Sequence, residues 1–114
     1  MSKGLSKSTI YDLVDTFDAE INNGGFHQFF SNSSGSQAAE TISALCAVGA
    51  AHTAEILKRA CARFPGGMPP RGWEERRRVL EAIAPTSHTF KEETNAFYEY
   101  RDNLMALAEA YRGG

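Results

Sequence analysis

A glycine pair between two apolar helical patterns constrains the fold of this chain more than any other feature. The pattern before it places apolar side chains on one helical face, at Ile10, Leu13, Val14, Phe17 and Ile21. Asn22-Asn23-Gly24-Gly25 follows at once, and Asn and Gly tolerate the left-handed backbone that ends a helix. Phe26, Phe29 and Phe30 then resume helical spacing. The sequence therefore predicts a corner between two helices, with a positive φ at Gly24 or Gly25 and the three phenylalanines in the core.

The rest of the chain also follows helical patterns, and no alternating strand pattern interrupts them. Helices are expected over residues 25–31, 36–46, 50–64 and 73–84, and a long C-terminal helix over 89–111. Pro65 to Gly72 is a loop by composition. We therefore predict an all-α fold: a single compact domain of five or six helices over residues 9–112, after a disordered N-terminal tail at residues 1–8.

Neither the cysteines nor the histidines form a recognisable reactive site. The predicted inward face of 36–46 is Ala39, Ile42, Leu45 and Cys46, and that of 50–64 is Ala50, Ala54, Leu57, Ala60, Cys61 and Phe64. Cysteines on such faces behave as small hydrophobes. His52 and Glu55 lie one turn apart but His52 points outward, so ligands do not converge on a metal. The sequence predicts no catalytic residue, no metal site and no cofactor.

The charge balance argues against nucleic acid as a partner. Twelve basic and fourteen acidic residues give a net charge of −2 and a pI of about 5.9, whereas nucleic-acid-binding domains usually have a pI above about 9. Arg76-Arg77-Arg78 fans around a helix at 100° steps and forms no single patch. No apolar run approaches the roughly 18 residues of a membrane span, and no secretory segment is recognisable. We expect a cytoplasmic protein with no membrane partner.

Arg76 is the exception among these arginines, because it falls at the middle of the apolar face formed by Val79, Leu80 and Ile83. An arginine cannot be buried without partners. The sequence therefore predicts that Arg76 is the least exposed of the three arginines. Its expected partner is a carboxylate, for which the candidates are Asp18, Glu20 and Glu93, or else the carbonyls near Asn22.

The run Asn-Asn-Gly-Gly-Phe-His-Gln-Phe-Phe-Ser-Asn-Ser-Ser-Gly, residues 22–35, resembles the hallmark of a bacterial family of small all-α domains of unassigned function. One member of that family is a DNA-mimic protein. Shorter matches follow in order at 48–50, 54–57, 64–66 and 97–98, so the likeness spans about Tyr11 to Tyr111. The resemblance implies a helical domain that acts by protein–protein contact and that can form homodimers. It does not imply an enzyme.

Two functional hypotheses remain open at this point. The first is a non-enzymatic protein-binding domain, for example a regulator, whose candidate contact residues belong to the motif: Asn23, Gly24, Gly25, His27, Gln28 and Asn32. The second is a small ligand-binding or hydrolase-like domain with a pocket around Asn23, His27, Gln28 and Asn32. A cleft with a buried His27 favours the second hypothesis, and a filled core beneath an exposed, flat motif favours the first.

Overall fold

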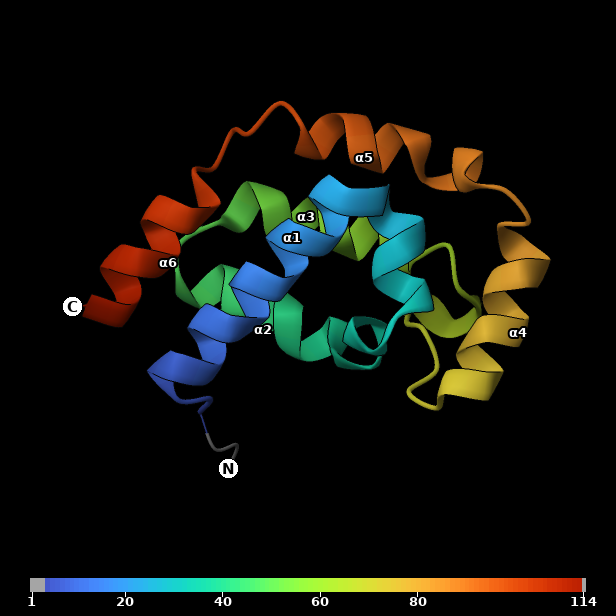
Figure 1. Ribbon diagram of the computed structural model, residues 1–114, viewed down its shortest axis with the longest axis horizontal. Coiled ribbons are helices and arrows are strands. Elements are labelled where there is room, and N and C mark those ends of the chain that lie inside the picture. The colour runs from blue at the N-terminus through green and yellow to red at the C-terminus, as the bar shows by residue number, and fades with distance from the viewer. Residues whose placement is uncertain (1–3, 114) are drawn as a thin grey trace.

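The computed structural model describes residues 4–113, and within this range the regular structure is helical with no strand (Figure 1). The helices are α1 (Lys7–Ser31), α2 (Ala38–Ala47), α3 (Ala51–Cys61), α4 (Trp73–Ile83), α5 (Lys91–Phe97) and α6 (Leu104–Gly113). Short 3-10 turns are η1 (Ser33–Gln37), η2 (Pro65–Gly67) and η3 (Ser87–Phe90). The predicted all-α domain is confirmed. In the described range no helix has the length and apolarity that crossing a membrane requires.

Helix α1 is the central element of the fold. It contacts α2, α4, α5 and α6, and Figure 1 shows it running through the middle of the molecule with α5 across the top. Its predicted apolar face is fully confirmed, since all five side chains are buried, from Ile10 to Ile21. The helix begins at Lys7 because the Ser6 hydroxyl accepts a hydrogen bond from the Thr9 amide at 3.1 Å.

This start is two residues earlier than the one expected at Thr9. Lys7 and Ser8 are helical, so they do not belong to the tail expected over residues 1–8. Residues 1–3 of that tail lie outside the described part of the chain. Thr9 followed three residues later by Asp12 resembles a capping box and favours a later start. The structure instead pairs Ser6 with Thr9, and the Ser6 hydroxyl donates to Thr9 Oγ1 at 2.8 Å.

The three phenylalanines after the glycine pair form the centre of the core, as predicted. Phe26, Phe29 and Phe30 are completely buried. Phe29 lies edge-on to Phe17 at 5.4 Å between ring centroids, and Phe30 lies edge-on to Phe64 at 4.9 Å. The first pair joins the two halves of α1, and the second joins α1 to the connection after α3. Each edge-to-face pair stabilises the fold beyond simple burial by about 0.5–1.5 kcal/mol.

The inward face predicted for residues 36–46 is wrong, because the buried side chains lie mostly one position earlier in the sequence than predicted. The buried side chains of α2 are Ala38, Thr41, Ala44 and Leu45, so of the predicted set Leu45 is buried while Cys46 is exposed. Ser36 does not cap the helix, because its hydroxyl donates to the Ser33 carbonyl inside η1. The 3-10 turn delays the start of α2 to Ala38 and thereby rotates the face.

The helical C-terminal region is confirmed, but the structure divides it into α5 and α6. Tyr100 takes a positive φ of 49° at the break, and it is 46% exposed although its spacing from Phe97 continues an apolar helical face. Asn103 caps the start of α6, since its Oδ1 accepts a hydrogen bond from the Ala106 amide at 3.3 Å. The break allows α5 to cover the corner of α1 while α6 packs along its first half.

Candidate functional site

The corner in α1 is built by two glycines in different conformations. Gly24 has φ −154° and Gly25 has φ 73°, and both depart from helical geometry. The predicted positive φ is therefore found at Gly25. A Cβ added at Gly24 would collide with the Gln28 side chain, which lies against it, and a Cβ at Gly25 would lie 3.1 Å from Thr94 Oγ1. Both positions thus need glycine, the first for space and the second for backbone conformation.

Residues in and after α5 satisfy the backbone groups that the corner leaves open. The Phe26 amide, at the start of the second half of α1, donates to Thr94 Oγ1 at 3.5 Å. The Tyr98 hydroxyl donates to the Ile21 carbonyl at 3.0 Å, and the Tyr100 hydroxyl donates to Asn22 Oδ1 at 2.8 Å. Helix ends need such partners, so these three hydrogen bonds hold the corner against α5 and the segment after it.

Two amides of the motif are held by Glu20 on the first half of α1. Glu20 Oε1 accepts from Gln28 Nε2 at 2.7 Å and from Asn32 Nδ2 at 3.0 Å. A carboxylate with two amide donors is a strong clamp between the two halves of the helix. Gln28 and Asn32 therefore stabilise the corner, and neither lines the cleft described next.

An open cleft of about 320 Å³ lies where the corner meets η3 and α5. Its lining residues are Asn23, Gly24, Gly25, Phe26, His27, His88, Lys91, Thr94, Asn95 and Tyr98. The structure thus brings together four of the six predicted binding residues, namely Asn23, Gly24, Gly25 and His27. The five lining residues from η3, α5 and Tyr98 were missed, because only the tertiary packing of α5 on α1 places them there.

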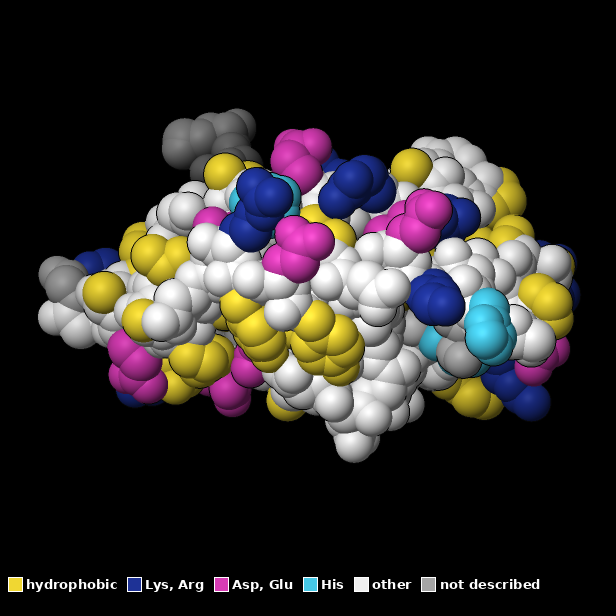
Figure 2. Space-filling view, turned by 90° about the horizontal axis from the view of Figure 1, so that it is seen from above, with side chains coloured by type: hydrophobic (Ala, Val, Ile, Leu, Met, Phe, Trp, Pro, Cys, Tyr) yellow, Lys and Arg dark blue, Asp and Glu magenta, His cyan; other side chains and the backbone are white. Residues whose placement is uncertain are grey.

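The polar groups of this cleft are basic or neutral. His27 is half-buried, and its Nδ1 lies 3.4 Å from Ser31 Oγ one turn later. His88 and Lys91 are exposed on η3 and α5. Figure 2, which looks down on α5, shows histidine and basic side chains close together at the right of the view. No Asp or Glu is among the lining residues.

Other chemistry finds little support in the described part of the chain. Residues 4–113 contain no group of three or more His, Cys, Asp or Glu side chains that could hold a metal ion. Burial raises the pKa of the Cys61 thiol to about 12, which makes it a poor nucleophile. Cys46 is exposed on α2 and does not line the cleft.

Arg76 forms none of the three predicted ion pairs with Asp18, Glu20 or Glu93. Its partners in the described chain are four carbonyls: Phe30 at 2.9 Å, Asn32 at 3.0 Å, Pro70 at 3.1 Å and Arg71 at 2.8 Å. Glu20 is occupied by amides, and Glu93 pairs with Arg63 at 3.0 Å.

The reason is geometric, because the planar guanidinium matches the carbonyls at the end of α1 that lack helical donors. Arg76 is 1% exposed, so the prediction that it is the least exposed of the three arginines is confirmed. Burial lowers its pKa from the ordinary value.

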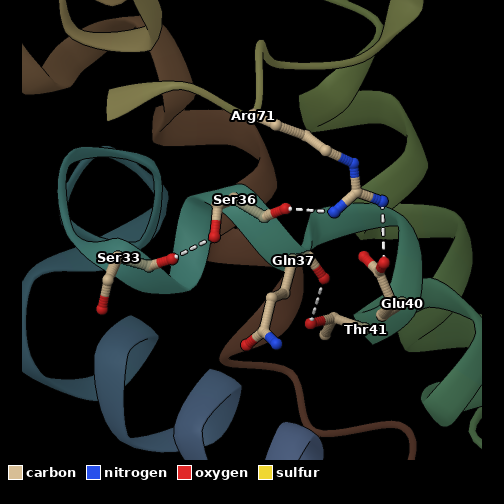
Figure 3. Close-up of polar contacts among 6 residues, drawn as sticks. All are labelled: Ser33, Ser36, Gln37, Glu40, Thr41 and Arg71. Atoms are coloured by element: carbon tan, nitrogen blue, oxygen red, sulfur yellow. Dashed lines mark hydrogen bonds and ion pairs between the residues drawn. The ribbon is translucent and has the colours of Figure 1, made fainter. Parts of the chain in front are cut away.

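A second arginine fixes the neighbouring loop to α2 (Figure 3). Arg71 donates to the Ser36 carbonyl at 3.0 Å and to Glu40 Oε2 at 2.7 Å. The hydrogen bond from Arg71 lowers the pKa of the Glu40 carboxyl below its usual value. Together Arg71 and Arg76 attach residues 65–72, which have little regular structure, to α1 and α2. This is a structural clasp outside the cleft.

Comparison with known proteins gives one positive result. No curated protein and no solved structure matches the chain. A family model described as DMP19-like protein matches residues 7–112, which covers all six α-helices except the last residue of α6. The matched region therefore includes the corner, the cleft and the arginine clasp. On this match, the chain belongs to the DMP19-like protein family.

Proposed function

We propose that this DMP19-like domain is a non-enzymatic, cytoplasmic protein-binding domain, and that it contacts its partner through the corner and α5. The corner surface, as we call it, consists of Asn23, His27, His88, Lys91, Asn95, Tyr98 and Tyr100. Membership of the family is the starting point, and the arrangement of the two tyrosines carries the proposal.

Tyr98 and Tyr100 expose their rings although their hydroxyls are fixed to α1. The side chains are 45% and 46% exposed, respectively, while the hydroxyls bind the Ile21 carbonyl and Asn22. A fixed aromatic ring loses little entropy when a partner covers it, and tyrosine is enriched where binding energy concentrates in interfaces. The rings also contact each other, with centroids 6.4 Å apart. They therefore form a preorganised apolar contact beside the cleft.

The alternative of a small-ligand or hydrolase-like site has one specific observation in its favour, the contact between His27 and Ser31. Two facts weigh against it. The Ser31 hydroxyl donates to the His27 carbonyl at 2.8 Å, so its proton is not directed to the imidazole, and the Oγ–Nδ1 distance is 3.4 Å. The cleft is open and its volume of about 320 Å³ is at the low end for sites that enclose a small molecule, roughly 300–1,000 Å³.

Site-specific photo-cross-linking tests this proposal. A photoreactive residue replaces Asn95, which is exposed in the cleft, and in the control it replaces Ala110, which is exposed on α6 outside it. We expect the Asn95 position to capture a discrete protein from cells of the source organism, and Tyr98→Ala to abolish the capture while circular dichroism stays helical. Equal capture from Ala110, or none from Asn95, contradicts the proposal. Capture of a second copy of the chain from Asn95 would identify the partner as itself.

A further inference from the structure

We infer that the corner surface receives an acidic segment of a protein partner, with one carboxylate bound in the cleft at Lys91. This inference rests on the proposed function and specifies the chemistry of the partner. It follows from the charges that line the cleft, from the hydrogen-bonding groups left free there, and from the shape of the surface around it.

The charge of the cleft has one sign. Lys91, His27 and His88 are the titratable lining residues besides Tyr98, and no carboxylate accompanies them, although the chain has fourteen acids. The acids next to Lys91 in sequence are engaged elsewhere. Glu92 and Glu93 both pair with Arg63 of the α3–η2 connection, at 3.7 and 3.0 Å. A partner carboxylate would therefore meet attraction in the cleft without a competing acid on its lining.

Most basic residues of the described chain form an ion pair with an acid, and Lys91 differs from them in this respect. Lys58, for example, pairs with Glu55 at 3.1 Å, and Arg101 pairs with Glu99 at 3.3 Å. Among the ion pairs of residues 4–113 none includes Lys91. Its ammonium is exposed, so no internal pair would have to break before it bound a carboxylate.

The cleft also offers free amide donors. The side chains of Asn23 and Asn95 line it, and neither makes a side-chain hydrogen bond within the described residues, unlike Asn22, which donates to the Asp18 carbonyl at 2.8 Å. A carboxylate accepts several donors at once, and a charge-assisted hydrogen bond is about twice as strong as a neutral one. Lys91 with one or both amides is a donor set suited to an Asp or Glu side chain.

The surroundings favour a peptide segment over a free anion. Tyr98 lines the cleft, its ring centroid lies 6.4 Å from that of Tyr100, and both hydroxyls are already bonded to α1. These rings present apolar area outside the cleft, which a small anion would leave uncovered. An acidic residue followed by an apolar one would use both parts, the carboxylate in the cleft and the apolar side chain on the tyrosines.

Selection from a random dodecapeptide library displayed on phage tests the partner chemistry. We expect the wild-type domain to enrich Asp and Glu beside an apolar residue, and Lys91→Glu to lose that enrichment. Binding of a selected peptide is then measured by fluorescence anisotropy. Lys91→Gln should weaken it about tenfold, the loss of one charge-assisted hydrogen bond, whereas the matched control Lys58→Gln should leave it unchanged.

A double-mutant cycle identifies the contact itself. If the peptide's key Glu binds Lys91, changing that Glu to Gln should weaken binding to wild type but have little effect on the Lys91→Gln variant. Three results overturn the inference: no acidic enrichment, equal effects of Lys58→Gln and Lys91→Gln, or displacement of the peptide by millimolar acetate. None of these affects the cross-linking result, so capture of a protein at Asn95 without acidic enrichment would reject this inference and leave the proposed function standing.

Discussion

At Gly25 the backbone adopts a conformation that other residues avoid, and this gives the corner its clearest test. Gly25→Ala should lower the free energy of unfolding by about 1 kcal/mol or more, because the positive φ of 73° strains any Cβ. Urea denaturation of the wild type and the variant measures the difference. Gly4→Ala is the control, since Gly4 is exposed before α1, has no positive φ, and a Cβ there would meet nothing within 4 Å. Equal losses for the two variants would contradict this account of the corner.

Arg76 is the residue whose removal should cost most among the three consecutive arginines. Arg76→Ala leaves four carbonyls without their donor in a buried site, so we expect a loss of about 3 kcal/mol. Arg78 is exposed and paired with Glu75 at 3.7 Å, and Arg78→Ala should change the stability little. If the alanine variant does not fold, Arg76→Lys should still show a measurable loss, because one ammonium cannot reach all four carbonyls. Equal, small shifts in Tm for all variants would show that Arg76 is dispensable.

The two cysteines should differ sharply in reactivity. Cys46 is exposed and Cys61 is buried, and burial raises the pKa of the Cys61 thiol to about 12. A disulfide reagent such as DTNB should modify one thiol in the native protein and two in denaturant. The raised pKa of the Cys61 thiol also makes the free energy of unfolding depend on pH. An unfolded thiol ionises near about pH 8.5, so the contribution of Cys61 is fully present below that pH and is lost as the pH rises toward 12. Rapid modification of both native thiols would contradict the burial of Cys61.

At the scale of elements, the segment between α5 and α6 does more than connect them. Asp102 Oδ2 accepts hydrogen bonds from the amide and the hydroxyl of Thr53, at 2.8 and 2.9 Å, in the first turn of α3. Asp102→Ala should therefore cost about 1 kcal/mol, as the loss of a helix cap does, and should speed hydrogen exchange at the Thr53 amide. Asp12→Ala, at an exposed position of α1, serves as the control. Unchanged exchange at Thr53 would mean that Asp102 does not cap α3.

The buried faces of the helices show where sequence patterns were sufficient to predict the fold and where they were not. Helical spacing identified the buried faces of α1 and α3 correctly, because each face is long and uninterrupted. The face of α2 was shifted because η1 delays the start of the helix, which spacing alone does not reveal. The break after Phe97 was missed because Tyr100 and Leu104 continue the spacing, and its cause is the tertiary bonding of Tyr98, Tyr100 and Asp102. The α5 half of the cleft was missed for the same reason.

At the scale of the whole molecule, the charges are balanced and largely paired. Eight of the fourteen acids form ion pairs in the described chain: Glu40, Glu55, Glu75, Glu81, Glu92, Glu93, Glu99 and Glu109. Duplex DNA presents one negative charge per about 1.7 Å of its axis, which is roughly 20 charges over a length of about 35 Å, the order of a compact domain's diameter. A net charge of −2 cannot reproduce that density, so we expect no DNA mimicry from this chain.

The opposite property, binding of duplex DNA, is equally unexpected. The densest basic segment is Arg76-Arg77-Arg78 on α4, and each of its guanidinium groups already has a partner within the chain. Arg76 is enclosed by carbonyls, Arg77 pairs with Glu81 at 3.5 Å and lies over the Trp73 ring, and Arg78 pairs with Glu75. Each phosphate contact would have to displace one of these partners and approach a carboxylate.

A gel-shift assay with a random-sequence duplex at physiological salt should therefore show no complex at micromolar protein, with Arg77→Ala plus Arg78→Ala behaving as wild type does. Lowering the salt to about 50 mM makes the assay more demanding, because electrostatic binding strengthens steeply there. Should a complex form that dissolves with added salt and disappears in the double variant, the guanidiniums of Arg77 and Arg78 must exchange Glu81 and Glu75 for phosphate. The surface of α4 would then be a nucleic-acid contact, and these exposed ion pairs would be too weak to keep phosphate away.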